Sequence, residues 1–336
     1  MKIKTKEKIL VTGGAGFIGS ALVWALNNRG QENIVITDYL GTSEKWKNLV
    51  PLCYADYLEA DDFLARLKHG EDAFGQFTRI FHLGACSATT EMDASYLVRN
   101  NYEYTKTLAH WAAHQNARFV YASSAATYGD GSQGMQDSVE CLPSLRPLNA
   151  YGYSKQMFDL YAMRTGLIHQ ICGLKYFNVF GPNENHKGEM RSLVCKAYKQ
   201  ISETGKISLF KSHRPDFKDG EQKRDFLYVK DAVDMTIHLS ETESANGLFN
   251  LGSGGARTWL DLAHALFAAM GRAPAIEFVD MPEVLRGKYQ YFTQADISAL
   301  RSTGYATAVT SLEESVADYV KHYLTPGKSL GEVLGH

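Results

Sequence analysis

The feature that most constrains the fold is a glycine-rich loop between a short apolar run and an amphipathic segment. Residues 8–12 predict a buried strand, and apolar residues at helical spacing follow the loop as far as Leu26. Two overlapping patterns fit the loop, G-x-G-x-x-G through Gly14, Gly16 and Gly19 and G-x-x-G-x-x-G through Gly13, Gly16 and Gly19. Such glycines let backbone amides approach a pyrophosphate at the positive end of the helix. The order of strand, glycine loop and helix therefore predicts the start of a dinucleotide-binding unit.

A second apolar run, residues 34–37, ends on Asp38, about twenty residues after Gly19. A dinucleotide-binding unit places at this point the acid that meets the adenosine ribose. The carboxylate favours a free ribose hydroxyl, as in NAD, whereas the 2′-phosphate of NADP needs a cation nearby. Lys45 and Lys47 follow closely, and each is either that cation or a surface lysine on a loop. Both cofactors therefore stay open at this point.

Apolar runs and helical segments alternate through the first half of the chain. Further buried strands are predicted over residues 79–87, 117–122 and 171–177. His82 lies inside one of these runs, so it is interpreted as a core histidine and not as a catalytic one. The alternation predicts an α/β fold, namely a doubly wound parallel (Rossmann) sheet with a smaller α/β substrate domain.

Strands and helices alternate less regularly in the second half of the chain, which predicts a second domain with a different function. We expect residues 1–178 to form the dinucleotide-binding domain, with a later segment, about 225–255, crossing back to it. Residues 179–330 are then mainly the substrate-binding domain. In this scheme residues 171–177 are the last long strand, residues 211–224 are a charged loop, and a helix opens at Asp231.

Charge and cysteine content exclude several classes of protein. Lys and Arg total 35 against 37 for Asp and Glu, giving a net charge of −2, so neither nucleic acid nor an anionic membrane is an expected partner. The 5 cysteines are scattered and lack C-x-x-C spacing, which argues against a disulfide framework and a metal site. The N-terminal lysines lead into an apolar run that breaks at Gly13, and no apolar stretch reaches the length of a membrane span. We therefore expect a cytoplasmic protein without an export signal.

A tyrosine and a lysine four positions apart, Tyr151 and Lys155, follow shortly after Ser124. On a helix these two side chains share one face. A free phenol has a pKa of about 10, and a neighbouring ammonium favours the phenolate and lowers that value. The tyrosine could then take a proton from a substrate hydroxyl, although the bare pattern also fits an ordinary amphipathic helix. Ser124 ends a predicted strand, at the edge of the sheet where open parallel sheets bind their ligands.

Fixed cations in the second half offer a site for phosphate groups. Arg224 precedes an apolar run, so its guanidinium can be held in place, and it is favoured over the loop lysines Lys218 and Lys223.

The glycine loop, Ser124 and the Tyr151-x-x-x-Lys155 pair together resemble the extended branch of the short-chain dehydrogenase/reductase family, which acts mostly on nucleotide sugars. The resemblance implies that Tyr151 is an acid and base and that Ser124 binds the reacting oxygen. It also implies that Lys155 lowers the pKa of Tyr151 and holds the nicotinamide ribose.

Further motifs narrow the resemblance to the nucleotide-sugar epimerases and, within them, to the ADP-heptose 6-epimerase group. They are F-H-L-G-A-C-S from Phe81, S-S-A-A-T-Y-G from Ser123, Y-F-N-V-F-G-P from Tyr176, His186-Lys187-Gly188, Arg224-Asp225-Phe226 and F-T-Q-A-D from Phe292. The implied reaction inverts carbon six of an ADP-heptose, for lipopolysaccharide, by transient oxidation and re-reduction. Lys187 is the implied second acid and base, and which of Tyr151 and Lys187 acts first stays open.

The resemblance also implies the binding residues. Those at the cofactor, NADP with NAD as the alternative, are Gly13, Gly16, Phe17, Ile18, Gly19, Asp38, Tyr39, Lys45, Leu83, Gly84, Ala85, Cys86, Ser87, Asn100, Lys155, Val179 and Lys187. Those at the substrate are Ser124, Asn178, Glu189, Lys196, Phe210, Arg224 and Tyr289. The implied assembly is a homo-oligomer, and pentamers are known in the group.

The chain departs from the group at several positions. Tyr39 stands where the group has an Asn, and Ala60 stands where it has a lysine associated with the 2′-phosphate. These two departures weaken the case for NADP, although Lys45 is still present to bind the 2′-phosphate. Glu189 and Lys196 replace a Ser and a His at the substrate, and residues 213–221 resemble an insertion.

Three rival functions are weighed against the 6-epimerase. A nucleotide-sugar 4-epimerase would share Ser124, Tyr151 and Lys155, whereas a 4,6-dehydratase would need an acidic pair where Ala125 and Ala126 stand. A dinucleotide-sensing protein without turnover would be expected to have lost one of the three shared residues.

Overall fold

The computed structural model describes residues 7–68, 74–287 and 289–332. Its larger part is a seven-stranded sheet in which all neighbouring strands run parallel. In spatial order the strands are β10 (Gly247–Leu251), β6 (Cys172–Tyr176), β5 (Arg118–Ser124), β4 (Arg79–His82), β1 (Ile9–Thr12), β2 (Ile34–Asp38) and β3 (Asp56–Glu59). The chain order reverses between β1 and β4, which makes this the point where a doubly wound sheet opens a crevice for a ligand. The predicted fold class is confirmed.

The central strands are buried and largely apolar because both faces of the sheet are covered. Side chains alternate along a strand, so Ile9 and Val11 join one hydrophobic cluster while Leu10 joins the other. All three side chains are fully buried. A strand that is buried on both faces reads as a continuous apolar run, which is how β1, β2 and β4 could be predicted from sequence.

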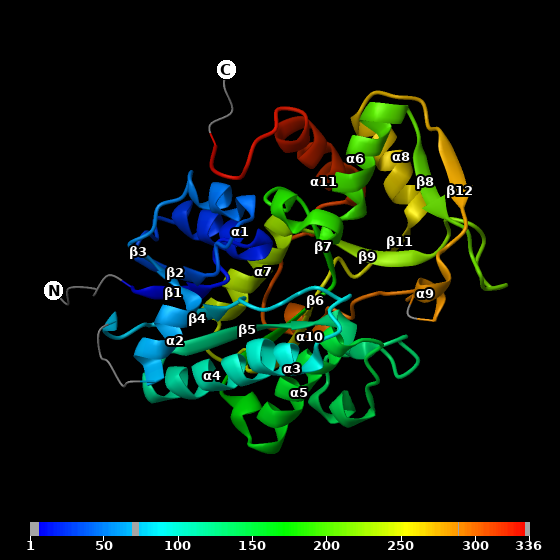
Figure 1. Ribbon diagram of the computed structural model, residues 1–336. Coiled ribbons are helices and arrows are strands. Elements are labelled where there is room, and N and C mark those ends of the chain that lie inside the picture. The colour runs from blue at the N-terminus through cyan, green and yellow to red at the C-terminus, as the bar shows by residue number, and fades with distance from the viewer. Residues whose placement is uncertain (1–6, 69–73, 288, 333–336) are drawn as a thin grey trace.

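Helices cover the two faces of the sheet (Figure 1). On one face lie α1 (Phe17–Asn27) and α7 (Val229–Glu241), which pack against each other. On the other lie α2 (Ala60–Lys68), α3 (Ala94–Leu97), α4 (Tyr104–His114) and α5 (Ala150–Arg164). Short helical turns join these elements, among them η1 (Glu44–Leu49), η4 (Ala125–Tyr128) and η7 (Asn185–Met190).

A smaller lobe lies beside the sheet, at the right of Figure 1. It contains a three-stranded sheet of β11 (Ala256–Thr258), β9 (Lys223–Tyr228) and β7 (Asn178–Phe180), and a strand pair of β8 (Ile207–Phe210) and β12 (Ile276–Val279). Helices α6 (Leu193–Thr204) and α8 (Trp259–Ala269) pack beside these strands, and α11 (Leu312–Tyr319) packs against α8. The two remaining α-helices of the described part are α9 (Glu283–Arg286) and α10 (Ser298–Ser302). Between residues 7 and 332, apart from the gaps given above, no helix has the length and apolar character to cross a membrane.

Several sequence-based boundaries need correction. Residues 171–177 are not the last long strand, because β10 extends the sheet beyond β6. The strand predicted over residues 79–87 ends at His82, where the chain turns into the loop that lines the ligand crevice. Lys223 and Arg224 belong to β9 and not to a charged loop, because Arg224 pairs with Arg257 in the ladder to β11. Helix α7 begins at Val229, two residues before Asp231.

His82 is a core histidine, as predicted. Its ring nitrogens lie 2.7 Å from Thr12 Oγ1 and 2.8 Å from Thr105 Oγ1. Burial lowers the pKa of the imidazole well below its usual range, so the ring is neutral and serves to join β1, β4 and α4.

Candidate active site

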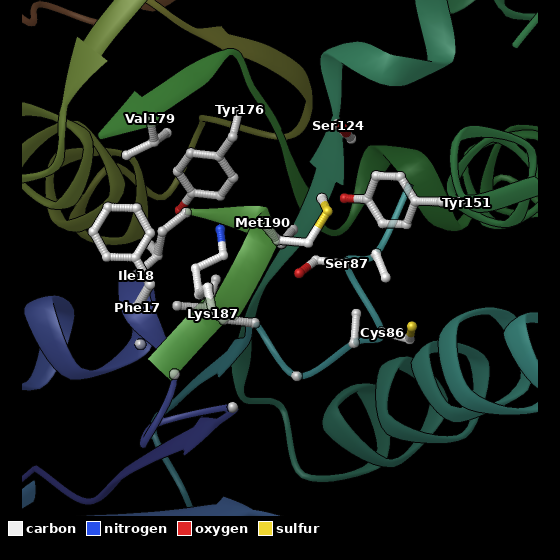
Figure 2. A pocket seen from close by; sticks show the side chains of 18 of the residues that line it. Phe17, Ile18, Cys86, Ser87, Ser124, Tyr151, Tyr176, Val179, Lys187 and Met190 are labelled. Atoms are coloured by element: carbon white, nitrogen blue, oxygen red, sulfur yellow. The ribbon is translucent and has the colours of Figure 1, made fainter. Parts of the chain in front are cut away.

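A cavity opens at the carboxyl ends of the sheet strands, around the reversal between β1 and β4 (Figure 2). Most of the predicted cofactor residues line it, namely Gly13, Gly16, Phe17, Ile18, Gly19, Asp38, Lys45, Leu83, Gly84, Ala85, Cys86, Ser87, Lys155, Val179 and Lys187. Ser124 and Tyr151 line the same cavity. The predicted cofactor residues Tyr39 and Asn100 lie outside its wall. This crevice is called the cofactor cavity below.

The glycine loop is packed so closely that side chains cannot be accommodated. Gly13 has a φ of +69°, and a Cβ on it would lie 2.6 Å from the backbone nitrogen of Gly84. A Cβ on Gly19 would lie 2.0 Å from the Gly13 carbonyl oxygen. The loop therefore brings bare backbone to the start of α1, and this is the cradle that a dinucleotide pyrophosphate requires.

Asp38 lies in the wall of the cofactor cavity, and both of its carboxylate oxygens accept hydrogen bonds. Its Oδ2 accepts from the Ala15 amide at 2.9 Å. Its Oδ1 accepts from the Tyr39 amide at 2.7 Å and pairs with Lys45 Nζ at 2.6 Å. Lys45 thus brings a positive charge to the cavity wall, whereas the Tyr39 hydroxyl turns away to Asp61, 2.6 Å distant.

Helix α5 is held close to the segment after β5, and this brings Tyr151 to Ser124. The Asn149 side chain caps the helix by accepting from the Gly152 amide at 2.8 Å. A Cβ on Gly152 would lie 2.7 Å from the Ala126 carbonyl oxygen, so glycine is needed for this approach. Figure 2 shows the Tyr151 hydroxyl pointing into the cavity.

The protonation of Tyr151 differs from the expectation that Lys155 would make its phenol acidic. Burial raises the pKa of Tyr151 above its ordinary value, and a hydrogen bond with Ser124 acts in the opposite direction. Lys155 Nζ donates instead to the Ala122 carbonyl oxygen at 2.8 Å. Burial lowers the pKa of Lys155 to about 8, while the Asp159 carboxylate opposes that shift. Tyr151 is therefore a neutral phenol, and the ammonium of Lys155 gives up its proton more readily than that of an ordinary lysine.

A buried ion pair fixes the face of α5 that carries Tyr151 and Lys155. Asp159 pairs with Lys175 of β6 at 3.0 Å, and both side chains are almost completely excluded from solvent. Asp159 also accepts from Tyr121 Oη at 2.8 Å and Ser123 Oγ at 2.7 Å, both on β5. Helix α5 is thus bonded to β5 and β6 one turn beyond Lys155.

Lys187 enters the cavity from η7 (Figure 2). Its Nζ lies 5.3 Å from the centre of the Phe17 ring. Burial lowers the pKa of Lys187, and the Glu184 carboxylate opposes that shift. Figure 2 shows the Lys187 ammonium and the Tyr151 hydroxyl on different sides of the cavity, with Met190 between them in this view.

The segment that carries Lys187 is anchored through Glu184, which is buried. The Glu184 carboxylate accepts from Ser192 Oγ at 2.6 Å and from Tyr319 Oη at 3.2 Å. Asn48 Nδ2 donates to the Asn183 carbonyl oxygen at 3.1 Å and to the Ala15 carbonyl oxygen at 3.0 Å. The segment is therefore bonded to the glycine loop on one side and to α6 and α11 on the other.

A second cavity, called the lobe cavity below, adjoins the first in the smaller lobe. Among the predicted substrate residues, Asn178, Lys196, Phe210 and Tyr289 line it. Val179 and Met190 line both cavities, which shows that the two are neighbours. Glu189 lies outside both walls, where its carbonyl oxygen accepts from Lys196 Nζ at 3.1 Å.

Arg224 also lies behind the wall of the lobe cavity. Its guanidinium carbon is 5.6 Å from the Trp259 ring and 4.9 Å from the Tyr289 ring. The side chain is buried, and its Nη1 donates to the Lys223 carbonyl oxygen at 2.9 Å. Within the described part of the chain no carboxylate forms a salt bridge with Arg224. A buried guanidinium without an acidic partner raises the local positive potential.

Sequence reasoning missed several residues of these walls, among them Tyr176, Met190 and Trp259. Tyr176, at the carboxyl end of β6, could have been found because other strand ends in the sheet also reach the cofactor cavity. Met190 and Trp259 carried no such signal, since the cavities in which they lie form only when distant segments pack together.

Comparisons with known proteins agree with this geometry. The family model described as NAD dependent epimerase/dehydratase family matches residues 9–252. A protein of Nitratidesulfovibrio vulgaris named ADP-L-glycero-D-manno-heptose-6-epimerase is 54% identical, with 94% of this chain and 97% of that protein covered. A Fusobacterium nucleatum protein of the same name is 46% identical, with 94% and 98% covered.

Solved structures give the same picture. The Helicobacter pylori ADP-L-glycero-D-manno-heptose-6-epimerase superposes with a TM-score of 0.78 at 25% identity, covering 96% of this chain and 98% of that one. The parallel sheet, the glycine loop and these matches lead to one assignment: the chain belongs to the NAD dependent epimerase/dehydratase family.

Proposed function

We propose that the protein is an ADP-heptose 6-epimerase that converts ADP-D-glycero-D-manno-heptose to the L-glycero form. Relatives that are 42% to 54% identical over nearly the whole chain carry this activity in their names. The observation that carries the proposal is the joint presence of Ser124, Tyr151, Lys155 and Lys187 in the wall of the cofactor cavity. The product would serve lipopolysaccharide inner-core synthesis, as the resemblance implies.

The residues of the cofactor cavity suit a bound nicotinamide dinucleotide. The glycine loop would receive the pyrophosphate, Lys45, held by Asp38, would lie at the adenosine ribose, and Lys155 would hold the nicotinamide ribose. When bound, the nicotinamide supplies reversible hydride transfer, which oxidises the carbon-six hydroxyl to a ketone and reduces it again.

Inversion requires the hydride to return to the opposite face of carbon six, so the ketone would turn relative to the nicotinamide and its oxygen would exchange a proton at a second position. Tyr151 and Lys187 are suited to this task, since they enter the cavity from different sides (Figure 2). One would take the hydroxyl proton of one epimer, and the other would return a proton to the oxygen of the second epimer. Ser124 would hydrogen-bond the reacting oxygen, and Met190 would help to exclude water.

For the cofactor, NADP is proposed ahead of NAD. Both oxygens of Asp38 are engaged by the Ala15 and Tyr39 amides and by Lys45, so the carboxylate is poorly placed to accept from a ribose hydroxyl. Lys45 partly neutralises that carboxylate and offers an ammonium to a 2′-phosphate.

The lobe cavity is proposed to bind the nucleotide end of the substrate. Its wall combines the aromatic rings of Phe210, Phe226 and Tyr289 with the cations Arg191 and Lys196. Rings can pack against a base while cations attract a pyrophosphate. On this proposal, residues 179–330 mainly serve substrate binding and residues 1–178, with residues 225–255, mainly serve the cofactor. A cytoplasmic homo-oligomer, pentameric by resemblance, completes the proposal.

The test is incubation of the pure protein, without added cofactor, with ADP-D-glycero-D-manno-heptose, followed by chromatographic separation of the two epimers. Conversion to a mixture of both epimers is expected, because a nicotinamide that the protein retains on purification would accept and return the hydride in each cycle without being consumed. UDP-galactose serves as the comparison substrate. Its 4-epimerisation with no conversion of the heptose would replace the proposal by the 4-epimerase.

A further inference from the structure

Trp259 determines how the Tyr289 hydroxyl takes part in hydrogen bonds. Trp259 Nε1 donates a hydrogen bond to Tyr289 Oη at 2.8 Å. An indole N–H can only donate, so the phenol must act as the acceptor in this bond. Its own proton is therefore left for another partner, and within the described residues the Tyr289 hydroxyl donates to no acceptor.

Both aromatic residues lie in the wall of the lobe cavity. Trp259 is fixed at the start of α8, where Thr258 and Asp261 form a capping box. Its ring also packs edge-on against Phe226, with 5.1 Å between ring centres. The indole is thus a rigid donor, and a phenol bonded to it cannot rotate freely.

Arg224 places a buried cation beside the Tyr289 phenol. Burial raises the pKa of Tyr289 above its ordinary value, so the group stays a hydroxyl and keeps its proton to share. The guanidinium, 4.9 Å from the Tyr289 ring, acts on this pKa in the opposite direction and adds positive charge next to the hydroxyl. The best acceptor for such a donor, next to a buried cation, is an anionic oxygen.

We propose that Trp259 is a positioning residue that aims the Tyr289 hydroxyl, as a hydrogen-bond donor, at a phosphate oxygen of the bound nucleotide. The inference rests on the proposed function, because that function places the nucleotide in the lobe cavity. Trp259 itself acts through Tyr289, and its ring need not touch the phosphate.

The test is a double-mutant cycle of Trp259→Phe and Tyr289→Phe, with ADP as the probe and titration calorimetry as the readout. The protein is saturated with NADP so that ADP cannot enter the cofactor cavity. Tyr289→Phe should weaken ADP binding about tenfold, as expected when a hydrogen bond to a charged group is lost. Trp259→Phe should weaken it about threefold or more, and the double variant should be no weaker than Tyr289→Phe alone.

Two controls keep the result specific. Trp46→Phe removes an indole on η1 that is 50% exposed and should leave the affinity for ADP unchanged. A benzothiophene analogue of tryptophan at position 259 keeps the fused rings but has no N–H donor, and it should reproduce the Trp259→Phe result. Adenosine, which has no phosphate, should bind equally well to the protein with and without the Tyr289 hydroxyl.

The proposal is overturned if Trp259→Phe leaves ADP affinity unchanged, if the two effects multiply in the double variant, or if the saturated protein does not bind ADP. Multiplied effects would mean that the indole contributes only packing. Failure of the epimerisation assay with an intact ADP cycle would instead count against the proposed function alone.

Discussion

Asp159 and Lys175 form an ion pair of 3.0 Å from which solvent is excluded on both sides. The pair joins α5 to β6, and Tyr121 and Ser123 donate to the same carboxylate from β5. It lies one helical turn beyond Lys155, so it anchors the face of α5 on which the proposed chemistry depends.

Asp159→Ala should therefore lower the free energy of unfolding by about 3–5 kcal/mol, because it leaves the Lys175 ammonium buried without a counter-charge. Urea denaturation followed by circular dichroism measures this loss. The matched control is Glu44→Ala, which breaks the 2.6 Å pair with Lys47 at a site where both side chains are exposed. That change should cost no more than about 1 kcal/mol. Equal losses in the two variants would contradict the anchoring role.

The protonation of Lys155 predicts a pH dependence of stability in the cofactor-free protein. Burial holds the pKa of this lysine at about 8, below its ordinary value of 10.5. Between these values the unfolded chain binds a proton that the folded chain lacks, so the unfolding free energy gained from this group rises with pH. The slope approaches about 1.4 kcal/mol per pH unit, and the contribution is lost as the pH falls to about 8.

Lys155→Met should remove that slope. Urea denaturation of the wild type and the variant, each at about pH 8 and about pH 10, isolates the contribution of this lysine from those of other groups. The variant should gain less stability than the wild type over this interval. The same gain in both proteins would show that Lys155 keeps an ordinary pKa.

Tyr151→Phe and Lys187→Ala should each lower the rate of epimerisation by at least about a hundredfold, since each removes one of the two proposed proton-transfer groups. The rate is measured by chromatographic separation of the epimers after timed incubation. Tyr153→Phe and Lys199→Ala are the controls, because Tyr153 is exposed on the same helix and Lys199 is exposed on α6. Full activity in either Tyr151→Phe or Lys187→Ala, with the fold intact, would refute the scheme with two proton-transfer groups.

Lys45→Ala should weaken NADP about tenfold or more while leaving NAD affinity the same or improved. The variant loses an ammonium that can bond the 2′-phosphate, and it leaves the Asp38 carboxylate unneutralised. Fluorescence titration with each reduced cofactor measures both affinities. Lys47→Ala, at an exposed lysine paired with Glu44, should change neither. An equal loss of affinity for both cofactors would mean that Lys45 stabilises the loop and does not bind the 2′-phosphate.

Local patterns in the sequence encode much of the fold and of the cofactor cavity. Strands buried on both faces read as apolar runs, and the glycines from Gly13 to Gly19 are needed because backbone packs against backbone there. Asp38 and Ser124 could be placed because strand ends in a parallel sheet meet at one edge. Each of these features depends on a few consecutive residues and can therefore be predicted from the sequence.

Features that depend on distant segments could not be predicted. The separation of Arg224 from the lobe cavity follows from the packing of two rings, Trp259 and Tyr289, that lie far from it in the chain. The bond from Lys155 to the Ala122 carbonyl oxygen likewise depends on how closely α5 approaches β5. The spacing of four residues predicts that Tyr151 and Lys155 share one face of a helix. It does not predict how deeply that face is buried, and burial is what shifts their pKa values.

Val179 and Met190 each present one side chain to both cavities. On the proposed function, a nucleotide in the lobe cavity would contact two residues that also line the cofactor cavity. On that proposal, binding of the nucleotide would help to fix Val179 and Met190 beside the sugar, and a sugar without its nucleotide would lack this support.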